Sequence, residues 1–131
     1  MEKQITEVIK SYEDACKMLD IDPVLSLPFS DDQEGDQLAI NATFKLMKIA
    51  KALNEGWTPD WQDNDQRKYY PWMDMEDDNR SGLGLSFSVC GSADSLSAVG
   101  SRLCFKSREL AEYAGRQFVG LYAEAWIIKG N

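Results

Sequence analysis

The stretch that decides the fold is QEGDQLAINATFKLMKIAKALN, at residues 33–54. Its apolar side chains recur at intervals of three and four residues, the spacing that gives an amphipathic helix one buried face. Those side chains are Leu38, Ala42, Leu46, Ile49, Ala50 and Leu53. Lys45, Lys48 and Lys51 mark the outer side of the helix and suit the negative C-terminal end of its dipole. The pattern predicts a long helix over about residues 33–54, which stops at Gly56.

Upstream of this helix, residues 11–14 (SYED) have the form of a capping box, with the serine in the N-cap position. They predict a short helix that ends near Asp20, because the residue before Pro23 disfavours further helical turns. Residues 21–32 contain two prolines and paired acids, which indicate a loop. Residues 2–10 have apolar side chains at helical spacing, but the segment is too short for this pattern to assign it.

Three strands are predicted after the long helix, at about residues 67–75, 83–90 and 101–106. The apolar positions of the second strand, which alternate with small or polar residues, are Leu83, Leu85, Phe87 and Val89. This period of two indicates a strand with one buried face. Pro71 favours an edge position for the first strand, since proline cannot donate to a ladder. The natural joining of three such strands is an antiparallel meander.

Ser107 caps a last predicted helix over about residues 107–128, which has one apolar face. That face consists of Leu110, Ala114, Phe118, Leu121, Tyr122 and Ala125. Together the elements predict an α+β fold in the order α-α-β-β-β-α, with about three helices packed on a small three-stranded antiparallel sheet. We expect a single domain over residues 1–131, with a helical part at about 1–56, the sheet meander at about 67–106 and the C-terminal helix last.

The composition indicates a small acidic protein of the cytoplasm. Its 131 residues are 44% apolar, enough for one core, and carry a formal net charge of −8. The beginning of the chain lacks the basic and apolar segments of a secretory signal, and no apolar run approaches the about 20 residues that cross a bilayer. Cys16, Cys90 and Cys104 are an odd number without framework spacing, which favours reduced thiols in a cytoplasm.

Acidic residues cluster in two parts of the chain, at residues 20–36 and 60–78. The candidates for an acidic surface are Asp31, Asp32, Glu34, Asp36, Asp74, Glu76, Asp77 and Asp78. Because an acidic surface repels phosphate, we expect no direct binding to nucleic acid or to a membrane. Two interpretations of the acids stay open. They keep a small protein soluble, or they form a stripe of carboxylates that imitates the phosphates of a nucleic acid.

The residues of common catalytic and metal sites are missing or scattered. The chain has no histidine, which excludes a Ser-His-Asp or Cys-His pair and an imidazole zinc site within it. The three cysteines lack CxxC spacing. Carboxylates at 60–65 and 74–78 are the remaining candidates for acid–base chemistry or a weak divalent-ion site. We therefore predict no cofactor, no metal and no enzymatic activity, with a carboxylate- and metal-dependent enzyme as an alternative.

An aromatic-rich segment, residues 57–72, joins the long helix to the first strand. Its candidates for binding a partner are Trp57, Trp61, Tyr69, Tyr70 and Trp72. Such residues are enriched at interfaces because they carry a large apolar area and, in tyrosine and tryptophan, a polar group. Two arrangements are open: the rings roof the core where the helix meets the strand, or they form an exposed surface, rimmed by acids, that would suit a protein partner.

Four segments are distinctive as strings: residues 13–19 (EDACKML), 52–57 (ALNEGW), 68–75 (KYYPWMDM) and 99–115 (VGSRLCFKSRELAEYAG). They resemble an uncharacterised family of small phage-like proteins from prophages and mobile elements of gut anaerobic bacteria. The resemblance spans most of the chain. It implies a mobile-element context, and it implies no catalytic residue or mechanism.

These observations favour a non-enzymatic accessory protein of a phage-like element, one that acts through protein contacts. The hypothesis rests on the aromatic segment beside the acids and on the missing catalytic residues. The alternative is an acidic mimic of nucleic acid that inhibits a host enzyme. The identity of the partner and the oligomeric state are left open.

Overall fold

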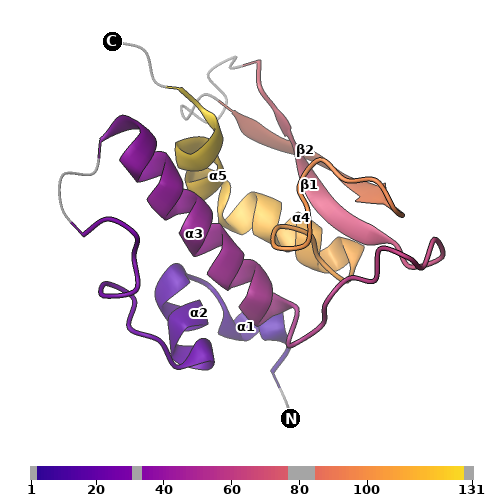
Figure 1. Cartoon of the computed structure of the whole chain (residues 1–131), viewed down its shortest axis with the longest axis horizontal. Helices are drawn as coiled ribbons and strands as arrows, with labels where there is room; N and C mark the ends of the chain where they lie inside the picture. The colour runs from indigo at the N-terminus through magenta and orange to yellow at the C-terminus, as the bar shows by residue number, and fades with distance from the viewer. Residues whose placement is uncertain (1–2, 31–33, 77–84, 129–131) are drawn as a thin grey trace.

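The computed structural model describes residues 3–30, 34–76 and 85–128. In these ranges the elements are α1 (Ile5–Val8), α2 (Tyr12–Leu19), α3 (Gly35–Leu53), β1 (Lys68–Asp74), β2 (Ser86–Ala93), α4 (Arg108–Gln117) and α5 (Val119–Trp126) (Figure 1). The two strands form one antiparallel sheet. The α+β class is therefore confirmed, whereas the three-stranded sheet and the helix count of the sequence prediction are wrong.

The elements pack in series. Helix α2 lies against α3, α3 against α5, α5 against α4, and α4 against both strands of the hairpin (Figure 1). Large buried side chains in the core between these layers include Ile9, Leu46, Leu53, Phe105 and Leu110. Burial of each such side chain contributes about 1.5–3 kcal/mol. Helix α4 thus covers one face of the hairpin, which we call the inner face, and leaves the outer face turned away from the helices.

The predicted long helix is α3, and its predicted face is the buried one. Ala42, Leu46, Ile49, Ala50 and Leu53 are all buried. The helix begins two residues later than predicted and ends one residue earlier. Spacing of three and four residues is therefore enough to place this element, because its apolar stripe is long and uninterrupted.

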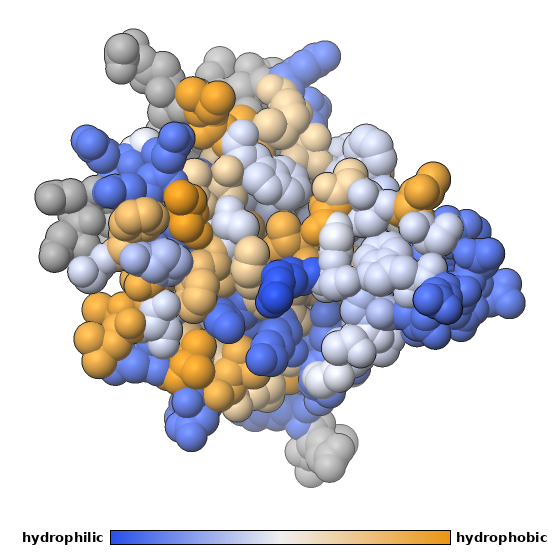
Figure 2. Space-filling view, in the orientation of Figure 1, coloured by the Kyte–Doolittle hydropathy of each residue, from blue (hydrophilic) through white to orange (hydrophobic). Residues whose placement is uncertain are grey.

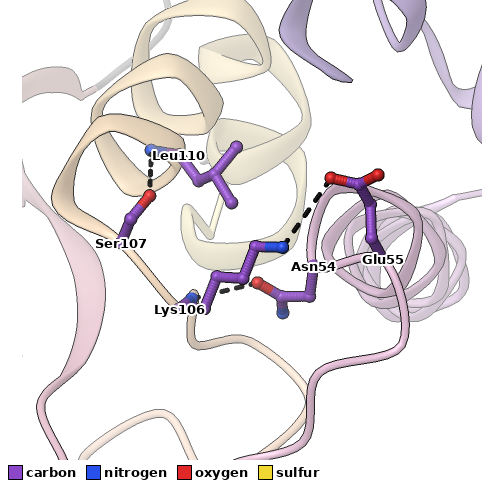
Figure 3. A network of polar contacts seen from close by, with 5 residues as sticks. All are labelled: Asn54, Glu55, Lys106, Ser107 and Leu110. Atoms are coloured by element: carbon purple, nitrogen blue, oxygen red, sulfur yellow. Dashed lines mark hydrogen bonds and ion pairs between the residues drawn. The ribbon is translucent and has the colours of Figure 1, made fainter. Parts of the chain in front are cut away.

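Two asparagines, one within α3 and one at its C-cap, bind the backbone of neighbouring segments. Asn41 Nδ2 donates to the carbonyl oxygen of Phe29 at 2.8 Å, and Asn41 Oδ1 accepts from the Phe29 N–H at 3.0 Å. Asn54 Nδ2 donates to the Cys104 carbonyl at 3.0 Å, and Asn54 Oδ1 accepts from the Lys106 N–H at 3.0 Å (Figure 3). Each side chain uses both its donor and its acceptor, so each fixes a passing segment to α3.

Both predicted serine N-caps are confirmed. Ser11 Oγ accepts from the Asp14 N–H at 3.1 Å, and Ser107 Oγ accepts from the Leu110 N–H at 3.2 Å (Figure 3). Helix α2 ends where predicted, at Asp20, whose left-handed backbone (φ 56°) reverses the chain. The segment that the sequence left unassigned contains the short helix α1.

The single helix predicted over residues 107–128 is two helices. The backbone leaves helical geometry at Phe118 (φ −112°, ψ 26°), which ends α4 and precedes α5. The two halves need different directions because α4 packs on the hairpin and α5 on α3. Phe118 is buried at the joint, and Leu110, Ala114 and Tyr122 of the predicted face are buried on either side of it. The apolar spacing continues across the change of direction, so it could not reveal the break.

The third predicted strand, residues 101–106, is reduced to a single bridge between Phe105 and Tyr69. The Tyr69 N–H donates to the Phe105 carbonyl at 3.0 Å, and the Phe105 N–H donates to the Tyr69 carbonyl at 2.7 Å. The next donor on this edge of β1 would come from Pro71, which has no N–H. In the other direction the chain enters α4 after Ser107. Pairing therefore extends neither way, and the proline that predicted an edge explains why the described residues 101–106 form no strand beside β1.

Strand β2 runs over Ser86–Ala93, three residues later than the predicted 83–90, and residues 83 and 84 lie outside the described ranges. Its pairing with β1 shifts by one residue at Ser88, which has no residue opposite it and forms a β-bulge. An extra residue reverses the alternation of faces. Phe87 consequently faces α4, whereas Val89 faces outward and is 60% exposed. The predicted buried face is right at Phe87 and wrong at Val89.

Candidate functional site

The five aromatic residues predicted as a binding surface fall in different environments. Tyr70 and Trp72 lie on the outer face of β1. Tyr69 lies on the inner face, against the core. Trp61 covers one end of the outer face, and Trp57 lines a cavity beside α3. Successive side chains of a strand point to opposite faces, which separates Tyr69 from Tyr70. The structure brings Tyr70 and Trp72 together and places the other three elsewhere.

Tyr70 and Trp72 form an aromatic pair on the open part of the hairpin. Their ring centroids are 6.1 Å apart and their planes are inclined by 32°. Trp72 is 54% exposed, and Val89, directly opposite it on β2, is 60% exposed. Gly91 lies opposite Tyr70. We call the surface made by Tyr70, Trp72, Val89 and Gly91 the hairpin patch.

Gly91 allows the Trp72 ring to lie directly on the backbone of β2. A Cβ atom at this position would overlap the Trp72 indole and come within 2.9 Å of Tyr70 Cε2. A glycine inside a strand often marks such a close approach of another group. The sequence prediction of the site did not include Gly91, although a glycine within an alternating segment is the signal that could have found it.

The other end of the outer face is closed by the loop that precedes β1. Lys68 has no exposed surface, and its Nζ donates to the backbone carbonyls of Asp63 at 3.1 Å and Asp94 at 2.7 Å. The same Nζ lies 5.1 Å from the centre of the Trp61 ring, and Trp61 Nε1 donates to Ser101 Oγ at 2.7 Å. Trp61 therefore serves to cover a buried cation and to fasten the loop.

A tight turn after α3 places Trp57. Glu55 (φ 50°) and Gly56 (φ 89°) both have left-handed backbones, and at Gly56 this conformation favours glycine. The turn brings Trp57, half-buried, back against the end of α3. There it lines a cavity of about 720 Å³ that is separate from the hairpin patch.

The predicted acidic surface is described at four of its eight positions. Glu34 and Asp36 are exposed at the beginning of α3. Asp74 is half-buried at the end of β1, and Glu76 is exposed just beyond it. The remaining four lie outside the described residues and are Asp31, Asp32, Asp77 and Asp78. The four described acids thus belong to two different elements.

Several carboxylates hold turns. The Oδ1 atoms of Asp60, Asp63 and Asp74 each accept a hydrogen bond from the backbone N–H two residues later, at 3.0, 2.9 and 2.9 Å. Asp22 Oδ1 accepts from the N–H groups two and three residues later, at 2.9 and 2.8 Å. These Asx turns give the four carboxylates a structural use. Across the described ranges, no three side chains of His, Cys, Asp or Glu gather as ligands for a metal ion.

Burial raises the pKa of two of the thiols. Burial raises the pKa of Cys104 to about 11 from its ordinary value of 9.0. Burial also raises the pKa of Cys90, with Glu112 acting in the same direction. The Cys104 and Cys90 sulfurs lie 3.6 Å from the backbone carbonyls of Ser101 and Arg108. Because the thiolate is the nucleophile, neither cysteine is an activated one at neutral pH.

Comparison with known proteins finds no matching family model, no matching curated protein and no matching solved structure. The resemblance to small phage-like proteins stays a prediction from the sequence. In the part of the chain that the structure describes, no helix has the length and apolar character needed to cross a membrane.

Proposed function

We propose that the chain is a non-enzymatic protein-binding protein whose hairpin patch takes up an apolar segment of a partner protein. The observation that carries the proposal is the 54% exposure of Trp72 beside Val89, which is 60% exposed. Contiguous exposed apolar area on a folded chain marks interaction sites. Tryptophan and tyrosine are also the residues that most often supply the binding energy of an interface.

The hairpin patch is arranged before any partner binds. The Trp72 ring rests on Gly91 and beside Tyr70, while the strands beneath it are packed on α4. A surface that is already ordered loses little side-chain freedom on binding, so more of the contact energy appears as affinity. The Tyr70 phenol adds a polar group at the rim of the patch.

The resemblance of the sequence to small phage-like proteins supports an accessory role in such an element, with a phage or host protein as the partner. The missing histidine and the raised pKa of Cys90 and Cys104 favour binding over catalysis. The nucleic-acid mimic has less support, because the described acids of its proposed stripe belong to two elements and Asp74 holds a turn.

Selection of peptides from a displayed library on the immobilised chain tests the proposal. Affinities of the recovered peptides are then measured by calorimetry for the wild type, Trp72→Ala and Leu25→Ala. Leu25 is an exposed leucine of the 21–30 segment, outside the hairpin patch, and serves as the matched control. We expect Trp72→Ala to weaken binding at least about tenfold, or about 1.4 kcal/mol, and Leu25→Ala to leave it unchanged.

Either of two results would contradict the proposal. The recovered peptides could bind Trp72→Ala as tightly as the wild type, which would move the site away from the hairpin patch. Both variants could weaken binding equally, which would indicate unspecific adhesion to exposed apolar residues. Circular dichroism of both variants confirms that the fold is retained.

A further inference from the structure

A second surface of the molecule combines a cavity with gathered positive charge. The cavity of about 720 Å³ lies between the C-terminal half of α3, the segment 57–59 that follows it, and residues 101 and 102. These segments converge at the end of α3 in Figure 1, and hydrophilic residues gather at the centre of the same face in Figure 2. The volume falls in the range of about 300–1,000 Å³ that is typical of small-molecule sites.

The lining of the cavity is apolar on one side and cationic on the other. Phe44, Met47 and Trp57 supply apolar surface. Three cations also line the cavity, namely Lys48, Lys51 and Arg102, and no aspartate or glutamate is among the lining residues. In a chain with a formal net charge of −8, three cations without an acid are an unusual local concentration of positive charge.

The dipole of α3 accounts for the two lysines but not for the arginine. Lys48 and Lys51 lie near the C-terminal end of α3, where cations are favoured. Arg102 comes from a segment about fifty residues later and is brought opposite them because Asn54 binds the backbone on either side of Phe105. Figure 3 shows the contact of Asn54 with Lys106. The tertiary structure, rather than the helix alone, therefore assembles the cationic side.

The cations are available to a ligand. Within the described residues, neither Lys51 nor Arg102 has a carboxylate partner within 4.0 Å. Lys48 Nζ lies 5.1 Å from the centre of the Phe44 ring, so this ammonium stands at the boundary between the apolar and cationic sides. Ser101 Oγ accepts from Trp61 and still has its own proton to donate.

We propose that this cavity binds a small organic anion that has a flat apolar body and one terminal carboxylate or phosphate group. The body lies against Trp57, Phe44 and Met47, and the anionic group lies toward Lys51 and Arg102. Charge-assisted hydrogen bonds from an arginine and a lysine are the usual means of holding such groups. This site is separate from the hairpin patch and does not depend on the function proposed for it.

Calorimetric titration with three related probes tests the proposal: 2-naphthoate, 2-naphthyl phosphate and the neutral 2-naphthamide. We expect saturable binding of at least one anion, at least about tenfold tighter than the amide, and weakening as salt is raised. Binding of one anion and not the other tells whether the site takes a carboxylate or a phosphate. Saturable binding of neither anion, or equal binding of the amide, would overturn the proposal.

Charge reversal at two exposed positions locates the site. We expect Lys51→Glu and Arg102→Glu each to weaken binding of the anionic probe about tenfold, which corresponds to about 1.4 kcal/mol. Lys17→Glu makes the same change of charge on the exposed side of α2, outside the cavity lining, and should leave binding within about twofold. If Lys17→Glu weakens binding as much as Lys51→Glu, the probe responds to overall charge and the cavity is not its site.

Discussion

On each face of the β1–β2 hairpin an aromatic ring rests on a glycine, but only the ring on the inner face is covered by a helix. On the inner face, a Cβ atom at Gly115 of α4 would overlap the Phe87 ring and come within 2.9 Å of Pro71. On the outer face, Trp72 rests on Gly91 of the hairpin itself. Helix α4 closes in Phe87, whereas 54% of Trp72 is exposed. Close contact between ring and glycine therefore does not define a core, because the presence or absence of a covering helix decides whether the ring is enclosed or exposed.

The largest effect is expected from Gly115→Ala, which tests how tightly the inner face of the hairpin is packed. The added methyl has no room beside the Phe87 ring and Pro71, so we expect a loss of about 3 kcal/mol in the free energy of unfolding, measured by urea denaturation. Gly120→Ala is the matched control in the next helix, where nothing lies within 4 Å of the added atom. The control should be neutral or stabilising by up to about 1 kcal/mol. Equal effects of the two substitutions would mean that the inner face is not tightly closed.

A pH titration probes the interior of the molecule through the buried thiol of Cys104. The folded-state pKa of Cys104, about 11, lies above its ordinary value of 9.0, so folding favours the protonated thiol. The contribution of the protonated Cys104 thiol to the free energy of unfolding is fully present below pH 9 and is lost as the pH rises through about 11. We expect the free energy of unfolding to fall by about 2 kcal/mol from this group over that window.

The variant Cys104→Ala separates this thiol from the tyrosines. Burial also raises the pKa of Tyr12, Tyr113 and Tyr122, so these groups add to the loss of stability at the alkaline end. Urea denaturation between pH 8 and 11 should show a smaller fall for the variant than for the wild type. Parallel curves for the two proteins would exclude Cys104 as a source of the pH dependence.

The outer face of the hairpin should tolerate a glycine-to-alanine substitution better than the inner face. In Gly91→Ala the Trp72 ring is free to swing into solvent, so we expect a loss of about 1 kcal/mol, well below that of Gly115→Ala. The near-ultraviolet circular dichroism should change as the ring moves away from Tyr70. A loss as large as that of Gly115→Ala would show that the hairpin patch is part of the core.

The smallest effect on stability is expected from Trp72→Ala. Its indole is more than half exposed, so its removal should change the free energy of unfolding by no more than about 0.5–1 kcal/mol. The same variant is expected to lose binding of an apolar peptide. A large change in stability without a change in binding would mean that Trp72 stabilises the fold and does not bind the peptide.

The sequence predicted correctly those features that depend on residues close together in the chain. The stripe of α3 and the serine caps at Ser11 and Ser107 depend on residues within a few positions of one another, and all three are found. The third strand and the unbroken last helix failed because their outcome depends on distant partners. Residues 101–106 have the alternation of a strand, but Pro71 prevents them from pairing further with β1. The last helix is divided at Phe118 because its second half packs on α3.

The candidate site shows the same division between local and distant causes. The aromatic-rich segment was enough to name Trp72 as a candidate, but it left open whether the ring is buried or exposed. The rule of alternation, applied to β1, would also have separated Tyr69 from Tyr70. The exposure of Val89 could not be foreseen, because a bulge at Ser88 follows from the pairing of two strands and not from either sequence by itself.

Asn41 and Asn54 give the chain a property of a different kind, tolerance of sequence change. Both amides hold neighbouring segments through backbone N–H and carbonyl groups, which every residue except proline possesses in full. The attachment at positions 29, 104 and 106 is therefore indifferent to which side chains stand there. A change of side chain at the exposed Lys106 therefore leaves its attachment to α3 intact, whereas the buried Cys104 and Phe105 remain constrained by packing.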